Sequence, residues 1–378
     1  MSIKRTNWVS NFNLVGSARI NDNTFKIDEV SQNGWDYNSM NLGVDCGEKC
    51  GVVYGNMMGG FSTKRDNVLY VHGKDEDGKD DWGNNFTIDW DDRFNDELLD
   101  TIGDGCFIQV GLERTDSGKL FVNKFLSEYD AIKYIKENLQ NDDVIIVRGN
   151  LKYSFYNDRV TMQREIKSVF LSKAEPENFR ATFRQSVLLD KDSVPKDDID
   201  VELGRAKIRV RVLDYAKEVN GVEVKGNYPF VFNFDFDFED KERFANFHKA
   251  ILKVKKDITQ VNFEGEFVNS GAVVQSTVDD ISDDLKALID IGMYTEEEVL
   301  SKFATNNSER RYVLTKPVIK QEGDEENKTI VPQIFPERYT EDDLDIVKIS
   351  ADVVDTKAIE DIISESDSSD DDWSELFD

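Results

Sequence analysis

Two stretches of the sequence alternate basic and apolar residues with the period of a β-strand, whose neighbouring side chains point to opposite faces. In Ile146–Tyr156 one face is apolar, and the other carries Arg148, Asn150, Lys152 and Tyr156. Cations follow phosphates and aromatic rings stack on bases, so such a face suits a single-stranded nucleic acid. An ordinary solvated face of an antiparallel sheet fits the same alternation.

The same spacing recurs in the stretches that follow. Asn157-Asp158 predicts a tight turn, after which Arg159 and Lys167 point outward, opposite an apolar face that includes Phe170. In 205–215 the basic residues again alternate with apolar ones. Trp35 and Tyr37 flank a turn. They either cover one end of the nucleic-acid-binding groove or hold a loop in place. The candidate nucleic-acid-binding residues are therefore Trp35, Tyr37, Arg148, Lys152, Tyr156, Arg159, Lys167, Lys207, Arg209 and Arg211.

Residue types for catalysis are sparse. His72 and His248 are the only histidines, and no phosphate-binding glycine loop or nucleophile elbow occurs. Cys46 and Cys50, with Cys106 and His72, could bind zinc, but without a second close pair incidental thiols fit better. The block 89–97 could hold a divalent metal, yet an acidic solvated loop explains it more simply. We therefore expect that this protein is not an enzyme and that it uses no cofactor.

Charge is distributed unevenly along the 378 residues, whose formal net charge is −29. Residues 321–378 hold 20 acidic and four basic residues, and 74–100 hold 11 and three. The remaining chain is only mildly acidic, so a local cationic surface stays compatible with phosphate binding. No apolar run reaches the length of a membrane span or signal peptide, and three cysteines suit a reducing compartment. We expect a soluble intracellular protein that binds no membrane.

The order of predicted elements repeats loosely along the chain. Strands precede a helix at Tyr129–Leu139, and two more strands follow it. The second half shows strands, an amphipathic helix at Lys241–Lys256, and strands again. Alternate phenylalanines in 230–238 fit a core face better than a stacking ladder. This pattern predicts a mainly β protein with some α-helix, built as two tandem OB-fold-like barrels.

The predicted domain boundaries follow from this order. The first OB-fold takes 1–178 with an acidic loop insertion at 74–100, and a connector takes 179–203. The second takes 204–320 with a helical insertion at 279–305. An acidic disordered tail takes 321–378.

The tail ends in an unusual composition. Its only large apolar groups in the last 15 residues stand near the tip, behind a run of acids. A solubilising tail needs no such anchors, whereas a docking peptide uses anchors for a pocket and charges for steering. The candidate docking residues are Asp370, Asp371, Asp372, Trp373, Leu376 and Phe377.

The tip DDDWSELFD resembles the acidic tails of single-stranded DNA-binding proteins of bacteria and their phages. The segments NLVGSARI, WDYNSMNLGVDC, YVHGKDEDGKDDW, DDVIIVRGNLKYSFYNDRV and EIKSVFLSK resemble a phage family of such proteins. The resemblance implies OB-folds and a tail that recruits replication, recombination and repair proteins. It also implies the cytoplasm of an infected bacterial host. The chain departs from the pattern by ending in Asp378 rather than Phe.

We therefore expect a protein that binds and protects single-stranded DNA during phage replication and recombination, and that recruits partners through its tail. The alternative is an acidic protein that mimics DNA and inhibits a DNA-binding enzyme. A metal-dependent nuclease that uses 89–97 is a third hypothesis. Oligomeric state, polarity and site size stay open.

Overall fold

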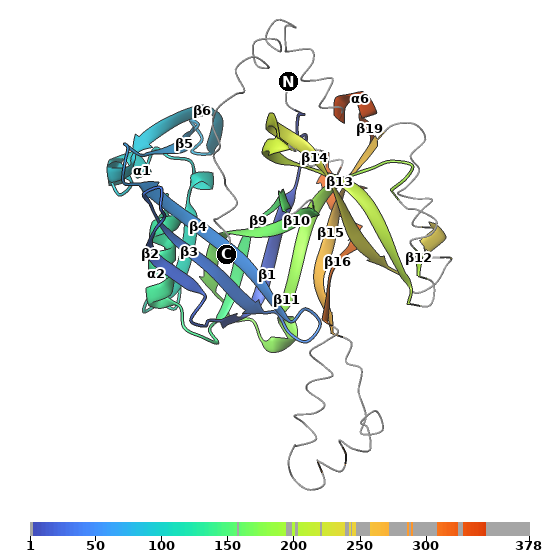
Figure 1. The fold of residues 1–378 in the computed structure, drawn as a ribbon, viewed down its shortest axis with the longest axis horizontal. Coiled ribbons are helices and arrows are strands. Elements are labelled where there is room, and N and C mark those ends of the chain that lie inside the picture. Colours follow the sequence, from blue (N-terminus) through green and yellow to red (C-terminus); the bar gives the residue numbers. More distant parts are fainter. Residues whose placement is uncertain are drawn as a thin grey trace, which may run out of the picture.

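The computed structural model describes residues 3–156, 159–193, 199–200, 203–219, 221–238, 258–271, 308–323 and 328–344, with the single positions 242, 244–246, 286 and 289. This part of the chain is mainly β-strand with few helices (Figure 1). Most of the strands join into one extended sheet that curls on itself.

Five strands close into a barrel. They pair in the order β1–β3–β4–β10–β9 and return to β1, and every step is antiparallel except β4–β10, where Asn56 lies parallel to Glu165. This is the connectivity of an OB-type barrel. The strands of this first ring are β1 (Ser10–Arg19), β3 (Trp35–Asp45), β4 (Val52–Ser62), β9 (Val144–Tyr156) and β10 (Arg159–Leu171).

Helix α2 (Glu128–Asn138) packs against β3 and β4 of the first ring. Ser127 caps it by accepting a hydrogen bond from the backbone N–H of Tyr129 at 3.1 Å. Ala131, Ile132 and Ile135 are buried, so the predicted helix exists and has one apolar face.

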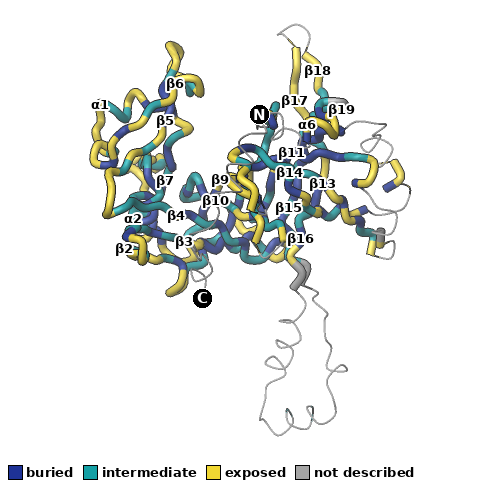
Figure 2. The backbone as a smooth tube through the Cα atoms, turned by 45° about the horizontal axis from the view of Figure 1, so that its top comes forward, coloured by how far each residue is buried: buried dark blue, intermediate teal, exposed yellow. Residues whose placement is uncertain are grey.

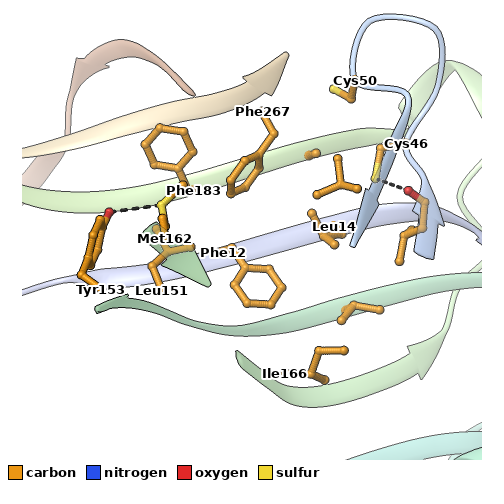
Figure 3. Packing of buried hydrophobic residues seen from close by; sticks show 14 of the residues in the cluster. Phe12, Leu14, Cys46, Cys50, Leu151, Tyr153, Met162, Ile166, Phe183 and Phe267 are labelled. Atoms are coloured by element: carbon orange, nitrogen blue, oxygen red, sulfur yellow. Dashed lines mark hydrogen bonds between the residues drawn. The ribbon is translucent and has the colours of Figure 1, made fainter. Parts of the chain in front are cut away.

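Apolar side chains from several strands fill the first ring (Figure 3). Phe12, Leu151 and Ile166 are at most 2 % exposed. Cys46 and Cys50 are buried in the same cluster, where desolvation raises the pKa of both thiols. These two cysteines are thus core residues.

A β-bulge interrupts the alternation of β10. The register with β9 shifts between Ile166 and Ser168, which makes Lys167 the extra residue. Past the bulge the inward position passes to Val169, which is fully buried, while Phe170 is only half-buried. The prediction of Phe170 as a core-facing residue is therefore wrong, because a period of two does not continue through a bulge.

Five further strands pair in the corresponding order. The sequence of pairs is β11–β13–β14–β16–β15 and back to β11, with β14 and β16 parallel at Asp235 and Val313. Four of the five alternate phenylalanines of 230–238 are buried, as predicted, and Phe232 packs against them half-buried. This second ring contains β11 (Arg180–Leu189), β13 (Arg205–Val219), β14 (Val222–Asp237), β15 (Ile258–Gly271) and β16 (Ser308–Pro317).

The two rings meet at the pair β1–β11. Strand β11 lies beside β1 through Ser10–Gln185 to Val15–Arg180, and β15 lies on its other edge. Residues 180–189, which the sequence interpretation placed in a connector, are therefore a central strand. The misassignment arose because RATFRQSVLL alternates basic and polar residues with buried ones, like an exposed segment.

The acidic insertion is a folded hairpin rather than a loop. Its small core contains Val71, Ile88, Ile102 and Phe107. The prediction of a loop at 74–100 is wrong because Ile88 inside this range is buried together with apolar residues that flank the range on both sides. The module consists of β5 (Val68–Lys74), β6 (Asp80–Asp89), η1 (Trp90–Asp92), α1 (Asp96–Leu99) and η2 (Asp104–Cys106).

The predicted disordered tail also begins too early. Tyr339 and Leu344 are buried with Ile3, Leu188 and Ile258, so residues 334–344 pack on the second ring. A hairpin, β17–β18, projects exposed from it (Figure 2). The elements here are β17 (Ile319–Glu322), β18 (Thr329–Pro332), β19 (Ile334–Tyr339), which pairs with β15, and α6 (Glu341–Leu344).

The remaining short elements border the two rings. The predicted helical insertion 279–305 and the docking residues 370–377 lie outside the described residues, apart from positions 286 and 289. Within the described chain, no helix has the length and apolar character to cross a bilayer. The remaining elements are β2 (Phe25–Val30), β7 (Ile108–Arg114), β8 (Leu120–Phe125), η3 (Pro176–Asn178) and β12 (Ile199–Asp200).

Candidate nucleic-acid interface

A surface trough of about 860 Å³ runs across the strands where the two rings join. Six strands supply its floor, in the spatial order β10, β9, β1, β11, β15 and β16. The polar side chains that line the trough are Asn11, Asn13, Arg148, Asn150, Lys167, Arg180, Thr182, Arg184, Glu264, Glu266, Thr315 and Lys316.

Strand register aligns these side chains in rows. In one row Arg148 lies opposite Asn13, which lies opposite Thr182 and then Glu266. Directly opposed side chains on one face of a sheet are neighbours at about 5 Å. A parallel row runs from Asn150 through Asn11, Arg184 and Glu264 to Lys316. The trough is therefore a continuous polar surface shared by both rings.

The trough is positively charged in a strongly acidic chain. Five cations and two carboxylates line it, whereas the whole chain carries −29. Arg184 pairs with Glu264 at 2.9 Å, and Lys316 lies 3.5 Å from the same carboxylate. An excess of one sign of charge in a cleft attracts ions of the other sign, here anions.

Arg148 and Arg180 hold the unneutralised charge. Arg148 Nε donates to the amide oxygen of Asn13 at 3.1 Å, and Arg180 donates to the carbonyl of Asn178 at 3.0 Å. Among the described residues neither guanidinium pairs with a carboxylate. Both can therefore bind an incoming anion without first breaking an ion pair.

Lys167 stands at the bulge on the rim of the trough. Its ammonium lies 3.1 Å from Glu128 and 2.5 Å from Glu165. Burial lowers the pKa of Lys167, but the two carboxylates outweigh it and raise the pKa above its ordinary value. This lysine stays charged, although part of its charge is already balanced.

The structure brings only two of the ten predicted binding residues into the trough, Arg148 and Lys167. The outward face of β9 continues past it to Lys152, which lies 4.0 Å from the buried carboxylate of Asp214. Tyr156 and Arg159 are exposed cross-strand partners at the end of the β9–β10 hairpin. These three residues extend the polar face of β9 beyond the trough.

The other predicted residues lie elsewhere. Trp35 and Tyr37 stack on each other on the outward face of β3, with ring centroids 4.9 Å apart and planes 12° apart. Lys207 and Arg209 are exposed on β13. Arg211 binds Glu341 through two hydrogen bonds of 2.8 and 3.3 Å and lies 3.3 Å from Asp190.

The ten candidate binding residues did not include Arg180, Arg184 and Lys316, which the structure places in the trough. The signal for the first two was their alternation with buried Ala181 and Phe183. Lys316 lies near the end of β16 and carried no signal of its own. Within the described residues no group of three or more His, Cys, Asp or Glu side chains is arranged to hold a metal ion.

Comparisons with known proteins identify a family. The family model described as YorF matches residues 107–362. No curated protein matches the sequence. Among solved structures, the wild-type single-stranded DNA binding protein from Thermus aquaticus is similar with 10% identity and a TM-score of 0.32, over 70% of this chain and 87% of that one. A deletion mutant of that protein gives 12% and 0.30, over 70% and 88%.

Proposed function

This chain belongs to the YorF family, and we propose that it binds single-stranded DNA in the trough between its two rings of strands. The observation that carries the proposal is the pair of uncompensated guanidiniums, Arg148 and Arg180, on a polar floor that both rings share. Phosphates would lie on the cations, and amides of Asn11, Asn13 and Asn150 would hydrogen-bond to the strand.

The matching order of strand pairs supports a second part of the proposal. We regard the two rings as tandem OB-folds joined at β1–β11. A strand that leaves the trough along β9 would reach Lys152, Tyr156 and Arg159, where Tyr156 offers an exposed ring for stacking. Trp35 and Tyr37 would serve a longer strand that passes around the first ring.

The acidic end of the chain supports a role in recruitment. Asp370–Asp372 would steer a basic partner, and Trp373, Leu376 and Phe377 would anchor in its pocket. In this proposal the protein is a non-catalytic coat of single-stranded DNA in a phage-infected bacterium, and it recruits replication or recombination proteins. The same acids would compete with DNA for the trough, so deletion of 364–378 should tighten binding at low salt.

The test is a fluorescence anisotropy titration with a labelled oligonucleotide at several salt concentrations. Arg148→Ala with Arg180→Ala should weaken binding and reduce the slope of log K against log salt by about 1.4, because each phosphate contact on a single strand contributes roughly 0.7. The charge-matched control is Arg114→Ala with Lys119→Ala, two exposed cations on the β7–β8 hairpin, and it should leave the slope unchanged.

Two outcomes would contradict the proposal. Equal losses in both double variants would mean that bulk charge, rather than the trough, drives binding. No binding at low salt, with and without 364–378, would favour the alternative of an acidic DNA mimic. The folded acidic hairpin β5–β6 would then be the candidate surface for its partner.

A further inference from the structure

The acidic hairpin module holds a thiol, an imidazole and a carboxylate in a chain of contacts. Cys106 Sγ lies 3.1 Å from Nδ1 of His72 and 3.9 Å from Nε2. On the other side of the ring, Nε2 lies 3.1 Å from Oδ1 of Asp80. A nucleophile next to a base that a third group orients is the arrangement that activates thiols.

Asp80 fixes which nitrogen of His72 carries the proton. Its Oδ1 also accepts a hydrogen bond from the backbone N–H of Gly105 at 3.0 Å. This bond and the contact with His72 lower the pKa of Asp80, so it is ionised at neutral pH. An ionised carboxylate favours a proton on Nε2, which leaves Nδ1 free to accept the proton of Cys106.

The surrounding loop encloses the imidazole closely. A Cβ atom at Gly103 would lie 2.4 Å from Asp80 Oδ1 and 2.6 Å from His72 Nε2, so only glycine fits there. Trp82 covers the ring, with centroids 4.1 Å apart and planes 32° apart. His72 is 5 % exposed, while Cys106 is only half-buried and can meet a small reagent.

We infer that Cys106 is a nucleophilic thiol that exchanges with small disulfides, with His72 as its base and Asp80 as the positioning residue. The sulfur gives its proton to His72 Nδ1 and attacks one sulfur of the disulfide. A new S–S bond forms to Cys106 and the original S–S bond breaks. The departing thiolate takes the proton from His72, so the products are a mixed disulfide and one free thiol.

The surroundings of the sulfur are consistent with a protonated resting state. Burial raises the pKa of the Cys106 thiol, while the backbone N–H of His72, which donates to the sulfur at 3.3 Å, acts in the opposite direction. The thiol therefore needs a base, and His72 is the base that contacts it. Cys46 and Cys50 are buried in the first ring without such a contact among the described residues.

Oxidised glutathione is the probe, used on the full chain without DNA and followed by intact mass and peptide mapping. Wild-type protein should form a mixed disulfide at Cys106 and leave Cys46 and Cys50 unmodified. Asp80→Asn keeps an acceptor for Gly105 but removes the charge that stabilises the protonated ring. It should slow the reaction roughly tenfold or more in protein that is still folded at the assay temperature, as its Tm would show.

His72→Gln is the second variant, because a glutamine can still reach Asp80 but offers no base to the sulfur. Its reaction should be slower still, although the smaller side chain exposes Cys106 more. Equal or faster rates in both variants would overturn the inference, since exposure alone would then set reactivity. Modification of Cys46 or Cys50 at the rate of Cys106 would also overturn it. The assay requires no oligonucleotide, so its result is independent of DNA binding.

Discussion

Phe12 of β1 and Phe183 of β11 are cross-strand partners at the seam between the two rings, and each also lies opposite a glycine of its own ring. Phe12 faces Gly149 of β9, and Phe183 faces Gly265 of β15. A register shift lies next to each glycine. The first and second rings of strands are therefore related by an approximate local two-fold axis that passes through the pair of Phe12 and Phe183.

The charged side chains of the trough do not follow this two-fold symmetry. Under it, Arg148, the partner of Asn13, corresponds to Glu264, the partner of Arg184. Asn150 corresponds in the same way to Glu266. Both carboxylates of the trough thus lie on β15, so an anion should bind closer to Arg148 and Arg180 than to β15.

Removing an acid from the second-ring side should strengthen DNA binding. Glu266 lines the trough and forms an ion pair with Lys49, so Glu266→Gln also removes this partner of Lys49. We expect affinity for an oligonucleotide to rise about twofold to fivefold at low salt and less at high salt, because salt screens the effect. The control Glu76→Gln makes the same charge change on an exposed residue of the β5–β6 turn. An equal gain there would show that only net charge matters.

Both glycines at the seam should be intolerant of a methyl group. A Cβ at position 149 would lie 1.9 Å from the backbone oxygen of Glu165. This oxygen cannot move away without disrupting the pairing of β9 with β10. Gly149→Ala should therefore lower the free energy of unfolding by about 3 kcal/mol in urea denaturation. Gly83→Ala is the control, because its nearest neighbour is the movable carboxylate of Asp81 at 3.3 Å. A Gly149→Ala variant as stable as the control would contradict the backbone geometry.

Arg211 should contribute to stability rather than to DNA binding. Its guanidinium is already bound by Glu341 and Asp190. Arg211→Ala should leave the salt dependence of oligonucleotide binding unchanged and cost up to about 1 kcal/mol of stability. Arg148→Ala, measured beside it, should reduce the salt slope by about 0.7. If both variants reduced the salt slope of oligonucleotide binding by the same amount relative to wild type, DNA would contact β13 as well.

Tyr129 should make the protein sensitive to alkali. Burial raises the pKa of Tyr129 to about 12, and its hydrogen bond to Asp28 acts in the same direction. Because the ordinary pKa is about 10, the unfolded chain ionises first as pH rises. The stability from this hydroxyl is present below pH 10 and is lost between about pH 10 and 12.

The measurement is urea denaturation of wild type and Tyr129→Phe from pH 8 to 12. The variant should be less stable at pH 8, and the difference should shrink towards pH 12. The exposed Tyr156 gives the control, Tyr156→Phe, whose curve should run parallel to that of wild type. A constant difference between Tyr129→Phe and wild type would contradict the assignment.

Local patterns in the sequence determined much of the fold. The strands β9 and β10, the buried phenylalanines of β14 and the helix α2 all follow from spacing, because a strand or helix with one buried face repeats apolar residues at its own period. The barrel connectivity of the first ring followed from the order of these elements. The folding of the acidic insertion and of the early part of the predicted tail did not follow from the sequence. Apolar residues there are scattered and show neither a strand period nor a helix period.

Only the tertiary structure determined which residues come together in the trough. Arg148 and Asn13 touch across 135 residues of sequence, and Arg180 joins them because β1 lies between β9 and β11. The contact of Cys106 with His72 spans 34 residues in the same way. A sequence specifies which side chains face outward on each strand, but which strands become neighbours depends on how their buried faces close into a ring. The trough arises from that closure, whereas the thiol site arises where the segment that carries Cys106 packs beside β5 in the hairpin module.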